Sequence, residues 1–362
     1  MPLDVLHDID IRLLGGALLV LAGIASSLLA RRFGAPLLLV FLALGLLLGV
    51  DGPGGIRYDD TRFTYFIGSL ALCVILFDGG LQTRAAQVRG SVAPSLVLAT
   101  VGVFLTASMT ALAAHWFLHL APLQSLLLGS VLASTDAAAV LFLLRAGGLH
   151  LERRAGSTLE MESGANDPVA IFLTIGLTTW IASGDAHQGG AIALAIRMLW
   201  AMTTGIALGY FGGRLIVWAL NRFELPSGLP PWLAMSGAVA LFAITNRLGG
   251  SGYLAVYLAG IVVANRPMRA RAELMSVQNA TTWFAQLVMF LLLGLLAAPR
   301  HLLDVLWPAL AVAASLMLVA RPLAVLLCLL PFRYRMGEIG FIGWIGLRGA
   351  VSIFLASIPL LA

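Results

Sequence analysis

Apolar runs of roughly 20 residues recur along the whole chain, and they restrict what it can fold into. A helix of that length crosses the hydrocarbon core of a bilayer, and inside lipid only helices and closed barrels satisfy their own backbone hydrogen bonds. Hydrophobic residues fill 60% of the 362 positions and charged residues only 11%, more apolar than a soluble domain. We therefore predict an all-α polytopic membrane protein with twelve spans: 11–30, 35–50, 63–80, 92–118, 122–144, 157–182, 191–220, 231–248, 252–265, 281–298, 302–331 and 338–361.

Arginine predicts the orientation of these spans, because loops kept in the cytosol are enriched in basic residues. The richer alternate loops carry Arg31/Arg32, Arg84/Arg89, Arg145/Arg153/Arg154, Arg222, Arg266/Arg269/Arg271 and Arg333/Arg335. The N-terminus is then outside the cytosol. The first run follows three aspartates and lacks a cleavage site, so we expect a retained helix. The net charge of +5 reflects these loops and does not indicate a nucleic-acid surface.

One span contains acids that a lipid-facing helix would not tolerate. The segment from Glu160 to Pro168 reads EMESGANDP, and an ionisable group at bilayer depth indicates a functional site. On a helix, Ser163 and Asp167 share one face, and Glu162 and Asn166 share the adjoining one. We expect Asp167 to hold an alkali cation or a proton.

Two other spans are expected to be interrupted near the membrane midplane. Ser134, Thr135 and Asp136 place polar side chains in the middle of one, and three glycines surround Arg348 in the other. Broken helices expose backbone groups and half-helix dipoles that bind small ions. We expect Thr135 and Asp136 to join Asp167 and Ser163 as ligands.

The two interruptions also correspond under a weak repeat of about 215 residues. The segment beginning RFG at Arg32 resembles the one beginning RLG at Arg247, and continuing this offset sets Asp136 against Arg348. An offset that holds an odd number of crossings inverts the second copy, as in secondary transporters. We therefore expect an inverted-repeat fold in which the two interrupted helices cross. Because a buried carboxylate near a buried arginine is often a structural pair, we also expect Glu162 to pair with Arg348.

Four motifs together resemble the monovalent cation/proton antiporter family, specifically its NhaP-type bacterial potassium/proton branch. They are LFDGGL from Leu76, TD at Thr135, ESGANDP from Glu162 and GLRGAVS from Gly346. The resemblance implies that Asp167 exchanges cation and proton, that Asn166 steadies the Thr135–Asp136 segment, and that Asp78 contributes to the ion path. An Asn-Asp pair is similar to the electroneutral members.

The resemblance sets further expectations. Residues 1–362 would form one transmembrane antiporter domain that lacks the final helix and the cytosolic tail of the family. We expect a homodimer in the cell inner membrane that exchanges potassium or sodium for protons in pH or cell-volume homeostasis. No cofactor, and no metal beyond the transported cation, is expected. The alternatives are a gated potassium efflux system of the same fold and an intramembrane aspartyl hydrolase using Asp136 and Asp167.

Overall fold

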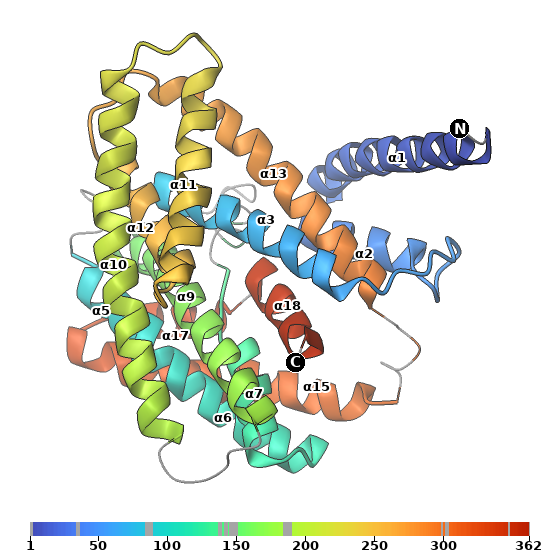
Figure 1. Ribbon diagram of the computed structural model, residues 1–362. Coiled ribbons are helices and arrows are strands. Elements are labelled where there is room, and N and C mark those ends of the chain that lie inside the picture. The colour runs from blue at the N-terminus through green and yellow to red at the C-terminus, as the bar shows by residue number, and fades with distance from the viewer. Residues whose placement is uncertain are drawn as a thin grey trace.

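The computed structural model describes residues 3–33, 37–83, 90–136, 140, 144, 151–183, 190–297, 300, 304–346 and 348–361. Every regular element in these ranges is a helix (Figure 1). The first half contains α1 (Leu3–Phe33), α2 (Leu37–Leu48), α3 (Thr61–Gln82), α5 (Val92–Val97), the π-helical turn η1 (Leu98–Gly102), α6 (Val103–Leu118), α7 (Pro122–Val131) and α9 (Arg153–Ser183).

The second half repeats much of this order. It contains α10 (Gly190–Arg222), α11 (Leu229–Arg247), α12 (Gly252–Ala264), α13 (Arg271–Leu296), α15 (Leu306–Ser315), the π-helical turn η2 (Leu316–Ala320), α16 (Arg321–Leu329), the 3₁₀ turn η3 (Leu330–Phe332), α17 (Met336–Trp344), α18 (Ala350–Ser357) and the 3₁₀ turn η4 (Ile358–Leu361).

The predicted spans agree with these helices over most of the described chain. Five helical stretches are long and apolar enough to cross a membrane: Thr61–Gln82, Val92–Leu118, Leu229–Arg247, Arg271–Leu296 and Leu306–Phe332. The span predicted over 281–298 begins ten residues earlier, at Arg271, because its first turns are polar and fall outside an apolar run. In the span predicted over 122–144, α7 ends at Val131, residues 132–136 are not helical, and residues 140 and 144 are helical again. Residues 137–139 and 141–143 lie outside the described ranges.

The helix boundaries follow the predicted repeat. α2 matches α12 about 215 residues later, α3 matches α13, and α7 matches α17. The long helical stretches Val92–Leu118 and Leu306–Phe332 also correspond. Each contains a π-helical turn, η1 in the first and η2 in the second. Packing is reciprocal too: α2 packs on α13, while α12 packs on α3. This exchange of partners is what an inverted repeat with a two-fold relation between the halves predicts. The inversion of one half relative to the other stays a prediction.

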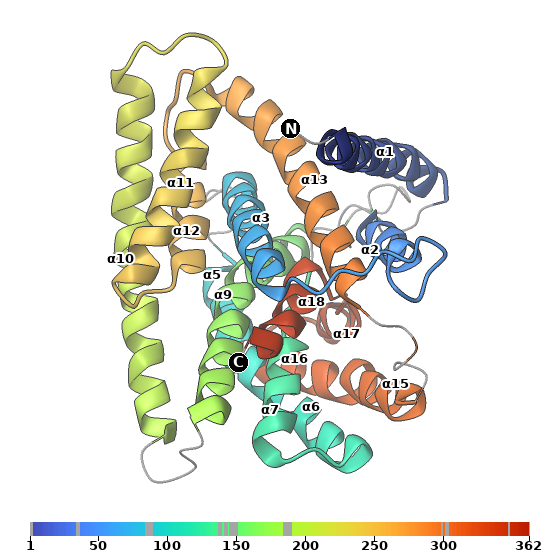
Figure 2. The same ribbon diagram turned by 45° about the vertical axis from the view of Figure 1, so that its right-hand side comes forward.

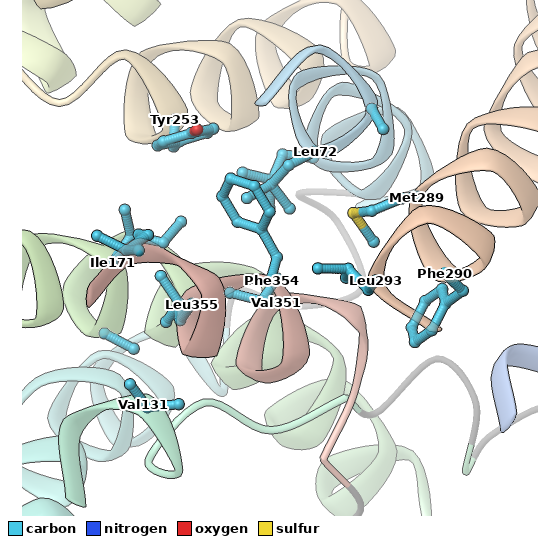
Figure 3. Close-up of a cluster of buried hydrophobic side chains, with 14 of the residues drawn as sticks. Leu72, Val131, Ile171, Tyr253, Met289, Phe290, Leu293, Val351, Phe354 and Leu355 are labelled. Atoms are coloured by element: carbon cyan, nitrogen blue, oxygen red, sulfur yellow. The ribbon is translucent and has the colours of Figure 1, made fainter. Parts of the chain in front are cut away.

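The short helix α18 lies inside the molecule among α3, α9 and α13 (Figure 2). Its Phe354 is fully buried, and the ring stacks on Tyr65 of α3 with centroids 5.7 Å apart. A Cβ added at Gly68 would be 2.4 Å from the Phe354 ring, so this glycine lets α3 approach closely. Side chains of five further helices complete the cluster (Figure 3). The packing fixes the second interrupted segment, which immediately precedes α18.

Candidate functional site

The helix α7 ends at Val131, and the backbone of residues 134–136 is not helical. Two side chains of α9 hold this break. Ser163 Oγ donates to the carbonyl oxygen of Thr135 at 2.9 Å, and Asn166 Nδ2 donates to Thr135 Oγ1 at 2.6 Å. A buried polar group without a hydrogen bond lowers the stability of the fold. The bond from Ser163 replaces a backbone hydrogen bond that is lost where the helix ends, and the bond from Asn166 pairs the Thr135 hydroxyl. The first predicted interruption is confirmed.

Asp167 lies next to the same break. Its Oδ1 accepts a hydrogen bond from Ser134 Oγ, and the residue is 9% exposed. Pro168 follows inside α9 and has no N–H, so the carbonyl of Gly164 lacks its helical donor. The Asp167 carboxylate and the Gly164 carbonyl therefore lie in the same turn of α9, and the Ser134 hydroxyl bonds to this carboxylate. Of the predicted ligands, Asp167, Ser163 and Thr135 gather here.

The second interruption separates α17 from α18 and carries Arg348. Its Nη1 donates to the carbonyl oxygens of Ala133 at 3.0 Å and Ser134 at 2.8 Å. Ser352 Oγ donates to the Ser134 carbonyl as well, at 3.3 Å. The guanidinium thus neutralises the carbonyl end of α7, where the helix dipole is negative.

The two interrupted segments also touch through Asp136. A Cβ added at Gly349 would be 2.4 Å from the Cβ of Asp136, a separation that real side chains do not reach. Only glycine at 349 allows the segments to meet. This close approach agrees with the prediction that the two interrupted helices cross.

The predicted pairing of Glu162 with Arg348 is wrong. Glu162 pairs with Arg321, the first residue of α16: Nη1 is 2.6 Å from Oε1 and Nη2 is 3.0 Å from Oε2. Both residues are buried, at 1% and 3% exposure. The two parallel hydrogen bonds use the planar geometry that guanidinium and carboxylate share. Arg348 instead binds backbone carbonyls.

Arg321 was missed although the sequence signals it. It lies inside the apolar run 302–331. A charged side chain in such a run is expected to form an ion pair or face a cavity, as are the acids of 160–167. The sequence does not show which of two intramembrane arginines faces Glu162, because that depends on how α16 lies against α9.

Asp78 lies apart from this group. It is 5% exposed on α3, and its Oδ2 accepts a hydrogen bond from Gln82 at 2.8 Å. On the facing helix α13, the fully buried Gln278 donates to the carbonyl of Val74 at 3.0 Å. None of the described hydrogen bonds or ion pairs joins Asp78 to Asp167. Gln278 was not among the predicted residues, since an amide in a run of mixed polarity gives no distinctive signal.

Tyr257 of α12 lies between the two acid-bearing helices. A Cβ added at Gly164 would be 2.3 Å from the Tyr257 Cζ and Oη atoms, so the ring packs directly on the backbone of α9. The same ring is within 4.0 Å of a Cβ built at Gly79 of α3. Its hydroxyl is buried with no hydrogen-bond partner among the described residues.

The chain is similar in sequence to known antiporters. The K(+)/H(+) antiporter NhaP2 of Shewanella sp. (strain ANA-3) is 46% identical over 348 residues, covering 96% of this chain and 60% of that protein. The K(+)/H(+) antiporter NhaP of Alkalimonas amylolytica is 44% identical over 357 residues, covering 99% and 62%. The chain thus spans about three fifths of the length of these relatives.

An antiporter of known structure has the same fold as this chain. The sodium proton antiporter MjNhaP1 from Methanocaldococcus jannaschii at pH 8 superposes with a TM-score of 0.84 and 22% identity, covering 97% of this chain and 85% of that one. The family described as "Sodium/hydrogen exchanger, transmembrane" matches residues 16–362. This is a family of secondary transporters and not of hydrolases. The multi-span helical chain therefore belongs to the transmembrane sodium/hydrogen exchanger family.

Proposed function

We propose that this protein exchanges a monovalent cation for protons across the membrane by competition of the two at Asp167. One observation carries the proposal: a buried carboxylate contacts a helix break that two side chains of its own helix hold open. A carboxylate in such a place is stabilised either by a proton or by a cation. Because both neutralise the same group, binding of one displaces the other.

The remaining residues of the group support Asp167. Ser163 and Thr135 present oxygen atoms at the break, as does Asp136, which packs on Gly349. Asn166 positions Thr135 through its amide. Glu162 and Arg321 neutralise each other and hold α9 to α16. Asp78 contributes to the ion path farther along α3.

We further propose potassium as the cation, since the relatives that are 44–46% identical are named K(+)/H(+) antiporters. The Na(+)/H(+) antiporter ApNhaP of Aphanothece halophytica is only 27% identical. In this proposal residues 1–362 form one transmembrane antiporter domain in the cell inner membrane, with the N-terminus outside the cytosol and the protein a homodimer. It would serve pH and cell-volume homeostasis.

Proteoliposomes test the proposal directly. Protein is reconstituted with an imposed proton gradient, and recovery of an entrapped pH-sensitive dye is followed on addition of potassium, sodium or lithium. Potassium is expected to give the largest recovery. Asp167→Asn should reduce it to the protein-free level, whereas Asp304→Asn, which removes an exposed acid far along the chain, should not. Cation-driven recovery by Asp167→Asn would contradict the assignment.

A further inference from the structure

A pocket opens on the outer face of α10, away from the group around Asp167. Its volume is about 440 Å³, and it is lined by Phe211, Arg214, Leu215, Val217, Trp218 and Arg266. Five of these residues belong to α10, and Arg266 follows the end of α12. A volume of this size accommodates a small ligand or a headgroup.

Arg214 stands within an apolar stripe that faces the surroundings. Phe211, Leu215 and Trp218 are 65%, 62% and 55% exposed, and their spacing places them with Arg214 on one side of the helix. Because the sequence predicts a membrane span over 191–220, we expect this exposed apolar face of α10 to contact lipid. A guanidinium in the same face must reach polar groups at the edge of the bilayer.

Two arginines converge on one neutral hydroxyl. Arg214 Nη1 donates to Tyr210 Oη at 3.1 Å, with its guanidinium carbon 5.7 Å from the centroid of that ring. Arg266 approaches the same hydroxyl. In the described part of the chain no ion pair joins either arginine to a carboxylate. Two like charges drawn together without a counter-ion form a site for an anion.

The backbone around Arg266 is fixed against α10. Asn221 Nδ2 donates to the carbonyl of Pro267 at 3.0 Å, and Asn265 Nδ2 donates to the carbonyl of Thr83 at 2.9 Å. The backbone next to Arg266 is therefore held against α10 and against the end of α3. Arg214 lies eight residues before Arg222, the last residue of α10, which is about 12 Å along the axis. Trp218 stands between them, where tryptophan marks the membrane interface.

We propose that this pocket binds an anionic phospholipid, with the phosphate between Arg214 and Arg266 and an acyl chain along Phe211, Leu215 and Trp218. Basic pockets on transmembrane helices recognise such headgroups. In the orientation proposed above, this end of α10 faces the cytosolic leaflet, whose surface is negatively charged. Tyr210 supplies a hydroxyl donor to the same phosphate.

The experiment measures lipid binding to delipidated protein in detergent through its melting temperature. Phosphatidylglycerol, phosphatidylcholine and inorganic phosphate are titrated separately. Phosphatidylglycerol is expected to raise the melting temperature well above the other two, since a ligand that binds only the folded state stabilises it. Arg214→Gln and Arg266→Gln should each raise the half-effective lipid concentration roughly fivefold, and Arg214→Lys should raise it less, because it keeps the charge. Arg269→Gln, on the same loop but outside the pocket, serves as the matched control.

Three results would overturn the proposal. The first is an unchanged response to phosphatidylglycerol in both glutamine variants. The second is an equal response to inorganic phosphate, which would identify a soluble anion. The third is a change of oligomeric state in Phe211→Ala without any change in lipid response, which would identify this face as a contact between subunits. Arg214→Gln and Arg266→Gln each keep one of the two arginines. The test therefore does not need the double variant, whose loss of expression would leave it without a result.

Discussion

Glu162 of α9 and Arg321 of α16 form a two-point ion pair inside the protein, with 2.6 Å between Oε1 and Nη1 and 3.0 Å between Oε2 and Nη2. Removing one partner strands the other charge, at a cost of about 3–5 kcal/mol. We expect Glu162→Gln and Arg321→Ala each to lower the melting temperature in detergent strongly. Glu162→Gln combined with Arg321→Leu should recover part of the loss. Single variants that melt like the parent but fail to transport would show a role in the exchange itself.

Asp167→Asn should abolish transport without lowering the stability of the protein, whereas Glu162→Gln should lower it. The amide oxygen of asparagine still accepts the hydrogen bond from Ser134 Oγ, and the variant removes a charge that a proton or cation must otherwise neutralise. We expect an unchanged or higher melting temperature together with complete loss of cation-driven proton flux in proteoliposomes. A large drop in melting temperature would indicate that Asp167 is part of a structural pair.

Arg348→Gln should reduce transport more than it reduces stability. The described hydrogen bonds of Arg348 go to the neutral carbonyls of Ala133 and Ser134, so removing its guanidinium leaves no carboxylate without a counter-charge, whereas removing that of Arg321 strands the charge of Glu162. We therefore expect a smaller loss of melting temperature than for Arg321→Ala, measured side by side. Arg348→Lys should retain part of the transport. An equal loss of stability in the two variants would contradict the distinction.

Gly164→Ala should disturb the contact between α9 and α12. The new methyl group would lie 2.3 Å from the Tyr257 ring, and overpacking of this kind costs about 1–3 kcal/mol. Tyr257→Leu in the same chain should relieve much of the cost. Gly156→Ala is the matched control on α9, because its nearest neighbour is the Leu151 Cβ at 3.7 Å. Equal melting temperatures for the two alanine variants would contradict the predicted clash.

Exchange should move no net charge if one proton leaves Asp167 for each monovalent cation that binds. The pair of Glu162 and Arg321 stays neutral throughout such a cycle. The rate of potassium-driven proton flux should then be the same at every membrane potential imposed with a gradient of a permeant organic ion, without valinomycin. A clear voltage dependence would show that a second carboxylate, Asp78 or Asp136, also carries a proton.

Much of the fold follows from local patterns in the sequence. Apolar runs predict most of the helices, because a bilayer leaves the backbone few alternatives. The polar triplet at Ser134–Asp136 predicts a break, since such side chains do not belong in a continuous lipid-facing helix. The glycines beside Arg348 predict the other break, and the structure shows that Gly349 is needed for a close approach to Asp136.

The partners of the charged residues could not be predicted in the same way. Glu162 has two candidate arginines, Arg321 and Arg348, on different helices, and sequence spacing carries no information about which helix faces α9. The contact of Tyr257 with Gly164 depends likewise on the packing of α12 against α9. Tertiary packing determines which side chains pair, whereas the local sequence determines where the helices form.

The hydrogen bonds of Arg348 also bear on how an ion would be dehydrated at this break. The Ser134 carbonyl already accepts two donors, the Ala133 carbonyl accepts one, and Thr135 gives its carbonyl to Ser163. These three oxygens are committed to the protein, so they do not form a ring of bare carbonyls of the kind that strips an ion of water and sorts cations by diameter. We therefore expect a cation bound at Asp167 in the proposed cycle to keep part of its hydration shell. In that proposal, discrimination between potassium and sodium depends on the energy of removing the remaining waters against the energy of binding to Asp167 and the neighbouring oxygen atoms.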